Sequence, residues 1–234
     1  MKKIMKKIMK KIMKKIIFIA IFALAFMAQS YAQDAYFLYN EGAKLTIANT
    51  DTKGKHTGYS TLEVKEVVGS RSNCTVKYES MVYDKKMNPM LTALMVQEFT
   101  VKNDVVTYDP QSMVGQVMQG MQVTVSGTPF SLPSNAKVGD TFPDYSITMN
   151  IAGIKTTSNV TGQKVVAAET ITVDGRAIDC VVIEQTTTSK VLGMNQSGTQ
   201  KTWYGKGCGS VKMETYNAKG KMVSGNILVG VEGM

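Results

Sequence analysis

Apolar and polar residues alternate with a period of two along most of the chain beyond residue 33, which is the pattern of strands with one buried face. The pattern is clearest in four segments: Leu62–Val68, Cys74–Val82, Tyr145–Ile151 and Ile178–Glu184. In the first segment we expect Leu62, Val64 and Val68 on the buried face. In the last, apolar residues occupy both faces, as in a strand at the centre of a sheet. The pattern therefore predicts a chain made mainly of strands.

Turn-forming residues separate these segments at short intervals. Asp174-Gly175 is a strong signal for a two-residue hairpin, because aspartate and glycine both tolerate positive φ. Asn217–Gly220 predicts a second hairpin. Further turns are expected at three places: Asp51–Lys55, Gly69–Asn73 and Asp84–Pro89. This spacing favours an antiparallel meander over βαβ units, so we expect an all-β, mainly antiparallel fold, either a curved sheet or an open β-barrel.

One segment departs from the period of two. Its apolar residues recur three or four positions apart: Met113, Val114, Val117, Met118 and Met121. This spacing is typical of a helix, and Pro110 suits the first turn of one. The sequence therefore predicts one short helix near residues 110–120, packed on the sheet or across the mouth of a barrel.

The two halves of the chain also resemble each other. Glu41–Leu45 and Val138–Phe142 both place a glycine three residues before an apolar side chain. In each half, strands rich in threonine and serine follow, then a pair of valines, a turn and a cysteine. The repetition predicts an ancient duplication, with similar β halves at about 33–127 and 128–234.

The start of the chain has the composition of an export signal. The first 16 residues repeat Met-Lys-Lys-Ile four times and carry eight lysines and no acidic residue. An apolar run of 13 residues follows, Ile16–Ala28, whereas a membrane-spanning helix needs about 20. The run leads to Ser30-Tyr31-Ala32, a small-residue pattern that suits signal-peptidase cleavage before Gln33. We therefore expect residues 1–32 to be a Sec-type signal peptide.

A cleaved signal peptide implies a periplasmic protein, and association with the outer membrane stays open. Translation could begin at Met13 in place of Met1 and still leave a signal of ordinary length. No cysteine stands at the cleavage site, so we expect no lipid anchor and no stable membrane anchor after cleavage. Retention of the apolar run as an anchor is the alternative.

The basic character of the whole chain belongs to its leader. The chain holds 27 lysines and arginines against 18 acidic residues, and eight of the lysines precede Gln33. The mature part therefore has 19 basic and 18 acidic residues, a net charge of +1. Nucleic-acid binding needs a clustered positive surface, so it is excluded. About 202 mature residues suffice for a single domain with a good core.

Three cysteines remain in the mature part: Cys74, Cys180 and Cys208. In an oxidising compartment we expect one disulfide and one spare thiol. The preferred pair is Cys180–Cys208. Three buried free thiols are the alternative.

A motif near the C-terminus resembles a known family. Lys201–Glu214 reads as a Trp-Tyr strand end, a glycine-rich turn and Val-Lys-x-Glu on the next strand. With the strand Cys180–Glu184 before it and the hairpin Asn217–Lys221 after it, this motif resembles the exported bacterial family known as domain of unknown function 3108. The resemblance is most specific over residues 178–228. It implies a periplasmic, β-rich open barrel, similar to lipoprotein carriers, with no assigned activity.

The residues of this motif also have a physical interpretation of their own. Gly205, Gly207 and Gly209 permit a tight turn in which side chains would clash. Trp203 can bury a large apolar surface while its indole N–H finds a partner. A hairpin that anchors the end of the barrel is the main interpretation, and ligand contact by Trp203 and Tyr204 is the alternative.

Candidate catalytic residues are few. The single histidine, His56, lies in a polar, turn-like stretch and is expected to be a surface residue. Ser134–Lys137 matches Ser-x-x-Lys but lacks the partner motifs of that chemistry. One histidine and widely spaced cysteines do not give the ligand spacing of zinc. We therefore expect no enzyme, no metal and no cofactor.

Methionine is the compositional oddity, because twelve of the 17 lie in the mature part. Flexible thioethers fill cores and also line adaptable apolar pockets. We therefore expect a pocket for an apolar small molecule or lipid, with these lining residues: Met113, Val117, Met118, Met121, Trp203 and Tyr204. The first alternative is a scaffold that binds another envelope protein, and the second is a hydrolase acting on envelope components.

The export signal is testable by mass. Protein purified from its own envelope fraction should have the intact mass of a chain that begins at Gln33, because signal peptidase removes residues 1–32. A mass that includes the apolar run Ile16–Ala28 would show a retained anchor instead.

Overall fold

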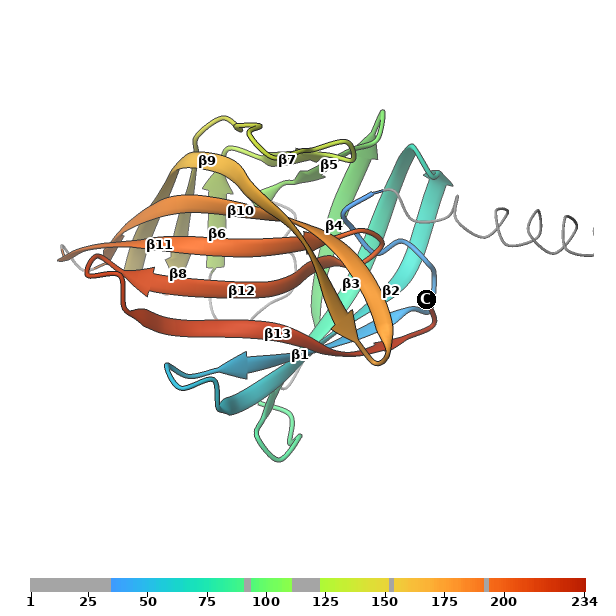
Figure 1. The fold of residues 1–234 in the computed structure, drawn as a ribbon, viewed down its shortest axis with the longest axis horizontal. Coiled ribbons are helices and arrows are strands. Elements are labelled where there is room, and N and C mark those ends of the chain that lie inside the picture. The colour runs from blue at the N-terminus through green and yellow to red at the C-terminus, as the bar shows by residue number, and fades with distance from the viewer. Residues whose placement is uncertain (1–34, 91–93, 111–122, 152–153, 192–193) are drawn as a thin grey trace, which may run out of the picture. The chain divides into compact units, whose positions relative to one another are not determined.

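Thirteen antiparallel strands form one continuous sheet in the computed structural model (Figure 1). The structure describes residues 35–234 apart from 91–93, 111–122, 152–153 and 192–193. The strands are β1 Lys44–Thr50, β2 His56–Ser70, β3 Asn73–Asp84, β4 Met95–Lys102, β5 Val105–Tyr108, β6 Val123–Gly127, β7 Phe130–Pro133, β8 Tyr145–Ile151, β9 Ile154–Val173, β10 Arg176–Val191, β11 Met194–Gly205, β12 Gly209–Asn217 and β13 Met222–Glu232. The all-β, mainly antiparallel prediction is thus confirmed.

The order of the strands repeats along the sheet. It runs β6-β8-β9-β10-β11-β12-β13-β1-β2-β3-β4-β5-β7. Strands β1–β5 lie side by side in chain order, and so do β8–β12. The strand that follows each run pairs with the first strand of the other run, β6 with β8 and β13 with β1. Each half of the chain therefore gives its last strand to the other half.

The resembling segments of the two halves make the same backbone contacts. Gly42 N–H donates to Val64 O at 2.9 Å, and Val64 N–H donates to Ala43 O at 2.9 Å. In the second half, Gly139 N–H donates to Val165 O at 2.9 Å, and Val165 N–H returns a bond to the residue after that glycine at 2.9 Å. Both valines are fully buried. The duplication stays a prediction. Matching backbone hydrogen bonds in the two halves are what a duplication would produce.

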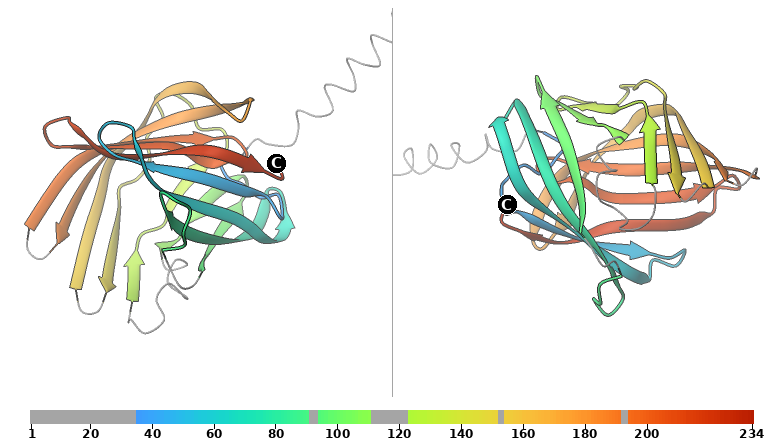
Figure 2. Two further views of the ribbon diagram at one scale, coloured as in Figure 1. Left: turned by 90° about the horizontal axis from the view of Figure 1, so that it is seen from below. Right: turned by 180° about the vertical axis from the view of Figure 1, so that it is seen from behind.

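The sheet curls, so that β2–β4 and β8–β11 form facing walls (Figure 2). Its two edge strands, β6 and β7, are consecutive in the chain and are joined only by Thr128 and Pro129. The two edges must therefore approach each other at this connection, although the strand order pairs neither edge with the other. The result is an open, incompletely closed barrel.

Aromatic side chains join the two edges of the sheet where they approach each other. We call this region, between β5 and β7 on one side and β6 and β8 on the other, the seam. Phe130 of β7 stacks on Tyr108 of β5 with ring centroids 5.9 Å apart. From the other edge, Tyr145 of β8 lies at 5.6 Å and Phe142 at 6.1 Å, and Tyr204 of β11 also lies at 6.1 Å. Tilted and edge-on ring pairs at such distances are favourable beyond the area they bury. Hydrogen bonds hold the other neighbouring strands together, whereas packing between aromatic rings holds the two edges together at the seam.

The segment Ala35–Leu38 fills the interior before the first strand begins. All four of its side chains are buried, at 2–5% exposure. Phe37 belongs to the larger core, which also holds residues of β1–β5 and of the β9–β13 region. Tyr36 belongs to a second core with these residues: Phe130, Leu132, Ala136, Val165, Val181 and Ile183. The Tyr78 hydroxyl donates to Leu38 O, and Gly207 N–H donates to Ala35 O at 2.7 Å, so the segment is also held through its backbone.

The predicted turns are confirmed. Asp174 and Gly175 have φ values of 48° and 75° and close the β9–β10 hairpin between the paired residues Val173 and Arg176. At the β12–β13 hairpin, the Asn217 side chain accepts backbone N–H bonds from Lys219 and Lys221 at 3.0 and 3.1 Å.

Val68 is a correction to the sequence prediction. It is 59% exposed, whereas Val64 on the same strand is fully buried. A β-bulge lies between Val64 and Glu66, which pair with the consecutive residues Tyr78 and Lys77 of β3. The extra residue reverses the alternation, so Val67 packs on the core and Val68 faces outward.

The predicted helix near 110–120 lies almost wholly outside the described residues. Within the ranges that the structure describes there is no α-helix, and accordingly none of them contains a helix long and apolar enough to cross a membrane.

The seam gives a stability prediction. Phe130→Ala should lower the free energy of unfolding by about 3–5 kcal/mol, because it removes a buried ring that contacts both edges of the sheet. Val68→Ala, at an exposed position, should change it by less than about 0.5 kcal/mol. Urea denaturation measures both. A loss below about 1 kcal/mol for Phe130→Ala would mean that other contacts hold the seam.

Candidate functional site

The inner face of β8–β12 is the wall on which a ligand could lie. Tyr145, Ile183 and Tyr204 are on this face, and all three belong with Phe130 of the opposite edge in the second core. The register of β10 and β11 extends the same face outward from this aromatic end. Side chains on it become steadily more polar: Thr202, Gln185, Gln200, Thr187, Ser189 and Gln196.

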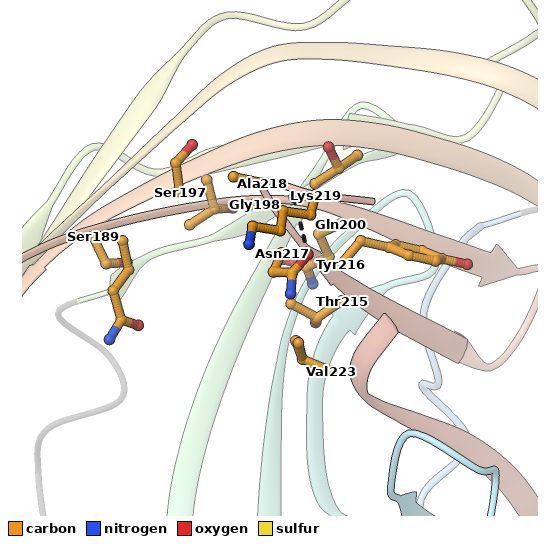
Figure 3. Close-up of a pocket in the computed structure, with 13 residues that line it drawn as sticks. Ser189, Ser197, Gly198, Gln200, Thr215, Tyr216, Asn217, Ala218, Lys219 and Val223 are labelled. Carbon is orange, nitrogen blue, oxygen red and sulfur yellow. Dashed lines mark hydrogen bonds between the residues drawn. The ribbon is translucent and has the colours of Figure 1, made fainter. Parts of the chain in front are cut away.

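A groove of about 630 Å³ occupies the polar end of this wall (Figure 3). Strands β10 and β11 and the β12–β13 hairpin supply its lining: Thr187, Ser189, Gln196, Ser197, Gly198, Thr199, Gln200, Thr215, Tyr216, Asn217, Ala218, Lys219 and Val223. Ser189, Thr215 and Val223 lie on one side of the ribbon and Ser197 on the other. Lys219 is the charged residue of this lining, and most of the other lining residues carry a hydroxyl or amide group beside their apolar atoms. We call this feature the polar groove.

A chain of amides connects the polar groove to the aromatic end of the wall. Gln185 Nε2 donates to Gln200 Oε1 at 3.1 Å. Gln200 Nε2 in turn donates to Thr202 Oγ1 at 3.4 Å and contacts the Met213 sulfur. Burial raises the pKa of Tyr145, and a hydrogen bond with Gln185 partly offsets that rise. The Gln200 amide is thus held in position before any ligand arrives.

Several groups of the polar groove are already engaged, and one is not. Ser189 and Ser158 share a hydrogen bond at 2.8 Å between their hydroxyl oxygens. Asn217 Oδ1 is used by the hairpin backbone, which leaves its NH₂ group. Thr187 Oγ1 is buried and has no hydrogen-bond partner. A buried hydroxyl without a partner is costly, and Thr187 belongs to the lining of the groove.

A charged cluster lies beside Tyr216, on the face of β12 that carries Lys212 and Glu214 and that also meets Trp203. The Tyr216 hydroxyl donates to Glu214 Oε2 at 2.5 Å, and Lys212 Nζ lies 2.8 Å from Glu214 Oε1. The hydrogen bond to this carboxylate raises the pKa of Tyr216 to about 12. Partial burial would raise the pKa of Glu214, but the bonds from Lys212 and Tyr216 lower it overall. The Glu214 carboxylate is therefore neutralised by its own neighbours.

Trp203 and Tyr204 face opposite sides of the sheet. Trp203 is 5% exposed, and its indole N–H donates to Glu169 Oε2 at 2.7 Å. Lys212 Nζ covers the ring at 4.2 Å from its centroid. Tyr204 instead joins the aromatic groups of the inner face, where burial raises its pKa well above the usual value. Of the two, Tyr204 alone lies on the wall beside the polar groove.

The glycine motif forms the turn between β11 and β12. A Cβ on Gly205 would collide with Val211 Cγ2 and Ile178 Cγ2. Gly207 and Gly209 have φ values of 72° and 78°, which side chains disfavour. The turn thereby packs closely enough for Gly207 to reach the backbone of residue 35.

Four of the predicted pocket residues lie outside the described residues: Met113, Val117, Met118 and Met121. Their part in a pocket stays a prediction. His56 is exposed at the start of β2, where its Nδ1 lies 3.3 Å from the Tyr59 hydroxyl. In the part of the chain that the structure describes, no group of histidine, cysteine and carboxylate side chains is suited to a metal ion.

All three cysteines are buried free thiols. Burial raises the pKa of Cys180 to about 12, and the nearby Cys208 adds to the rise. Burial also raises the pKa of Cys208 to about 11, against an opposing effect of Arg176. Cys180 and Cys208 are thus neighbours, and their pairing in an oxidising compartment stays a prediction.

Sequence reasoning missed the residues of the polar groove. The available signal was the placement of Thr187, Ser189, Gln196 and Gln200 at positions where alternation predicts an inward face. Inward polar residues on two neighbouring strands favour a hydrated or ligand-lined interior over a packed core.

A family model agrees with the motif found in the sequence. The DUF3108-like model matches residues 40–228, which covers β1–β12 and part of β13. No curated protein matches the sequence.

Two solved structures have a similar fold. One is a Bacteroides fragilis protein with a YmcC-like fold, described as a candidate exported protein, with 18% identity and a TM-score of 0.68 over 84% of this chain and 98% of that one. The other, described as a candidate lipoprotein of Parabacteroides distasonis, has 15% identity and a TM-score of 0.70 over 85% and 98%. At these identities the likeness establishes the fold alone.

The buried thiols predict how stability depends on pH. The folded protein keeps the Cys180 proton until about pH 12, whereas the unfolded chain loses it near pH 8.5. This raised pKa favours the folded state fully below about pH 8.5 and less as pH rises toward 12. Under reducing conditions, urea denaturation at pH 7 and pH 10 should show a larger loss for the wild type than for Cys180→Ala, by about 1–2 kcal/mol. Equal losses would mean that the thiol titrates normally.

Proposed function

The chain belongs to the DUF3108-like family, and we propose that it is a non-enzymatic binding protein of the cell envelope that holds an apolar or lipid-like ligand against the inner face of its sheet. We propose the periplasm as its location, because residues 1–32 have the composition of a signal peptide. The descriptions of the two similar structures as a candidate exported protein and a candidate lipoprotein support an envelope location.

The observation that carries the proposal is the graded inner wall of β8–β12. Its aromatic end joins the second core, whereas its far end opens into the polar groove of about 630 Å³. Cavities of roughly 300–1,000 Å³ suit small molecules, and such sites combine an apolar lining with a few placed polar groups. A wall with this gradient suits a molecule that has an apolar and a polar part.

Exposed apolar side chains on the inner face support the same function. Met149 of β8 is 37% exposed and shares a face with Tyr145, because the two are separated by an even number of residues on a strand without a bulge. Its partner in β6, Val125, is half-buried. This side of the sheet therefore offers apolar surface that the described residues leave uncovered.

A scaffold that binds another envelope protein is the second candidate, and one observation favours it. Apolar side chains in the connection between β3 and β4 are exposed: Met87 at 46%, Met90 at 64% and Leu94 at 43%. Apolar residues gathered on a surface often mark a protein contact. Crosslinking in intact cells separates the two functions, because a defined protein adduct supports the scaffold.

Native mass spectrometry tests the binding function. Mature protein purified gently from its own envelope extract should carry an added mass of lipid size that disappears on denaturation. Met149→Asp should reduce the occupied fraction, because it replaces an exposed apolar side chain of the inner face by a carboxylate. A charge that the ligand buries costs about 1–3 kcal/mol, or roughly tenfold in affinity.

Val166→Asp is the matched control. Val166 is 39% exposed. It is the extra residue of a β-bulge in β9, between Val165, which pairs with Ile183, and Ala167, which pairs with Val182, and it is not part of the second core. This variant should keep the ligand. Well-folded wild type without any adduct, or equal loss in both variants, would contradict the proposed site.

A further inference from the structure

We propose that the polar groove binds an uncharged, hydroxyl-rich head group, that of a glycolipid, an inference that rests on the proposed function and specifies the ligand class. The apolar chain of the same ligand lies along the aromatic end of the inner wall. Three independent features of the groove carry this assignment: its charge, its hydrogen-bonding groups and its shape.

The charge of the groove does not suit an anionic head group. Sites for phosphate or carboxylate groups use arginine forks, clustered lysines or helix N-termini. The lining contains neither arginine nor an acidic residue, and its one lysine, Lys219, is exposed at the tip of the β12–β13 hairpin. Glu214, on the opposite face of β12, is already bound by Lys212 and Tyr216. Apart from Lys219, the lining of the groove is therefore uncharged.

The hydrogen-bonding groups of the groove match hydroxyl groups. Side-chain amides and hydroxyls both donate and accept, as the hydroxyls of a sugar do. Thr187 Oγ1 is buried without a partner, the Asn217 NH₂ group is left over from the turn, and Gln200 is held in place by Gln185. All three side chains line the groove.

The backbone shapes a flat seat between these groups. Thr187, Gly198 and Asn217 lie directly opposite one another on three neighbouring strands. Gly198 has no side chain, and a Cβ there would collide with the carbonyl oxygen of Tyr216. The centre of this row is therefore bare, with a hydroxyl on one side and an amide on the other. Such a seat suits a flat, polar ring.

The seat lies at a suitable distance from the apolar end. Gly198 and Tyr204 are on the same strand and the same face, with Gln200 and Thr202 between them. Six residues of extended strand span about 20 Å. An amphiphile with its ring at Gly198 therefore reaches the aromatic group around Tyr204 with a chain of ordinary length.

Dodecyl probes with the same chain and different heads test the head-group assignment. Isothermal titration calorimetry, below the concentration at which each probe forms micelles, compares dodecyl maltoside, dodecyl phosphate and free maltose. We expect the maltoside to bind at least about tenfold more tightly than the phosphate. Free maltose should bind far more weakly, because it lacks the chain.

Two variants and one control locate the binding. Thr187→Val and Gln200→Leu should each weaken the maltoside by about three- to tenfold, the range of one or two lost hydrogen bonds. Thr188→Val is the matched control, because Thr188 is exposed on the opposite face of β10. It should leave affinity unchanged.

Each of the other calorimetry results would overturn either the head-group assignment or the proposed function. Equal binding of both dodecyl probes, or preference for the phosphate, overturns the head-group assignment and leaves the proposed function standing. If neither Thr187→Val nor Gln200→Leu weakens the binding of dodecyl maltoside, the head-group assignment is also overturned. Free maltose that binds as tightly as the maltoside makes the ligand a soluble sugar. Absence of binding by every dodecyl probe overturns the proposed function as well.

Discussion

The packing of Phe130 against rings from both edges of the sheet is the interaction on which this architecture depends. The edge strands β6 and β7 meet through two linking residues and without pairing to each other, so hydrogen bonds do not close the curl. Tyr108 on one side and Tyr145 and Tyr204 on the other do so through ring contacts at 5.6–6.1 Å. Ring contacts tolerate small changes in angle and separation better than a strand ladder does. An interior closed in this way can widen slightly without losing its backbone pairing.

The exchange of last strands explains why two similar halves form one domain. Each run of five strands ends at a neighbour that belongs to the other half, β13 beside β1 and β6 beside β8. Neither half can complete its sheet alone, because its first strand would leave an unpaired edge. The halves differ at one point, since β12 pairs with β13 whereas β5 pairs with β7 and not β6. The polar groove lies at the closed, paired end of this pattern, on β10–β13.

The sequence predicted the strands and turns well because their signals are local. Asp174-Gly175 and Asn217–Gly220 act within a few residues, and Tyr145–Ile151 coincides with β8. The prediction for Val68 was wrong because a β-bulge shifts the register by one residue. The period of the sequence pattern does not reveal such a bulge. The groove was missed because its members are brought together by cross-strand register, and the partner of Thr187 in β11, Gly198, carries no side chain to attract notice. Trp203 is the opposite case, because it is conspicuous in the sequence but does not line the groove. Its ring lies on the other face of the sheet, against Glu169 and Lys212.

The burial of Ala35–Leu38 has a consequence for the time course of folding. Ribosomes make this segment before any strand, yet its carbonyl partner Gly207 and the strand that pairs with β1, β13, are among the last residues made. The first and last parts of the chain therefore complete the same interior, which gives the domain a high contact order and slow folding. The segment can pack on β1–β5 as soon as these strands form, but its contacts with the β9–β13 region and its backbone bond to Gly207 wait until synthesis is nearly complete. The interior of this domain is therefore completed only when synthesis of the chain is nearly finished.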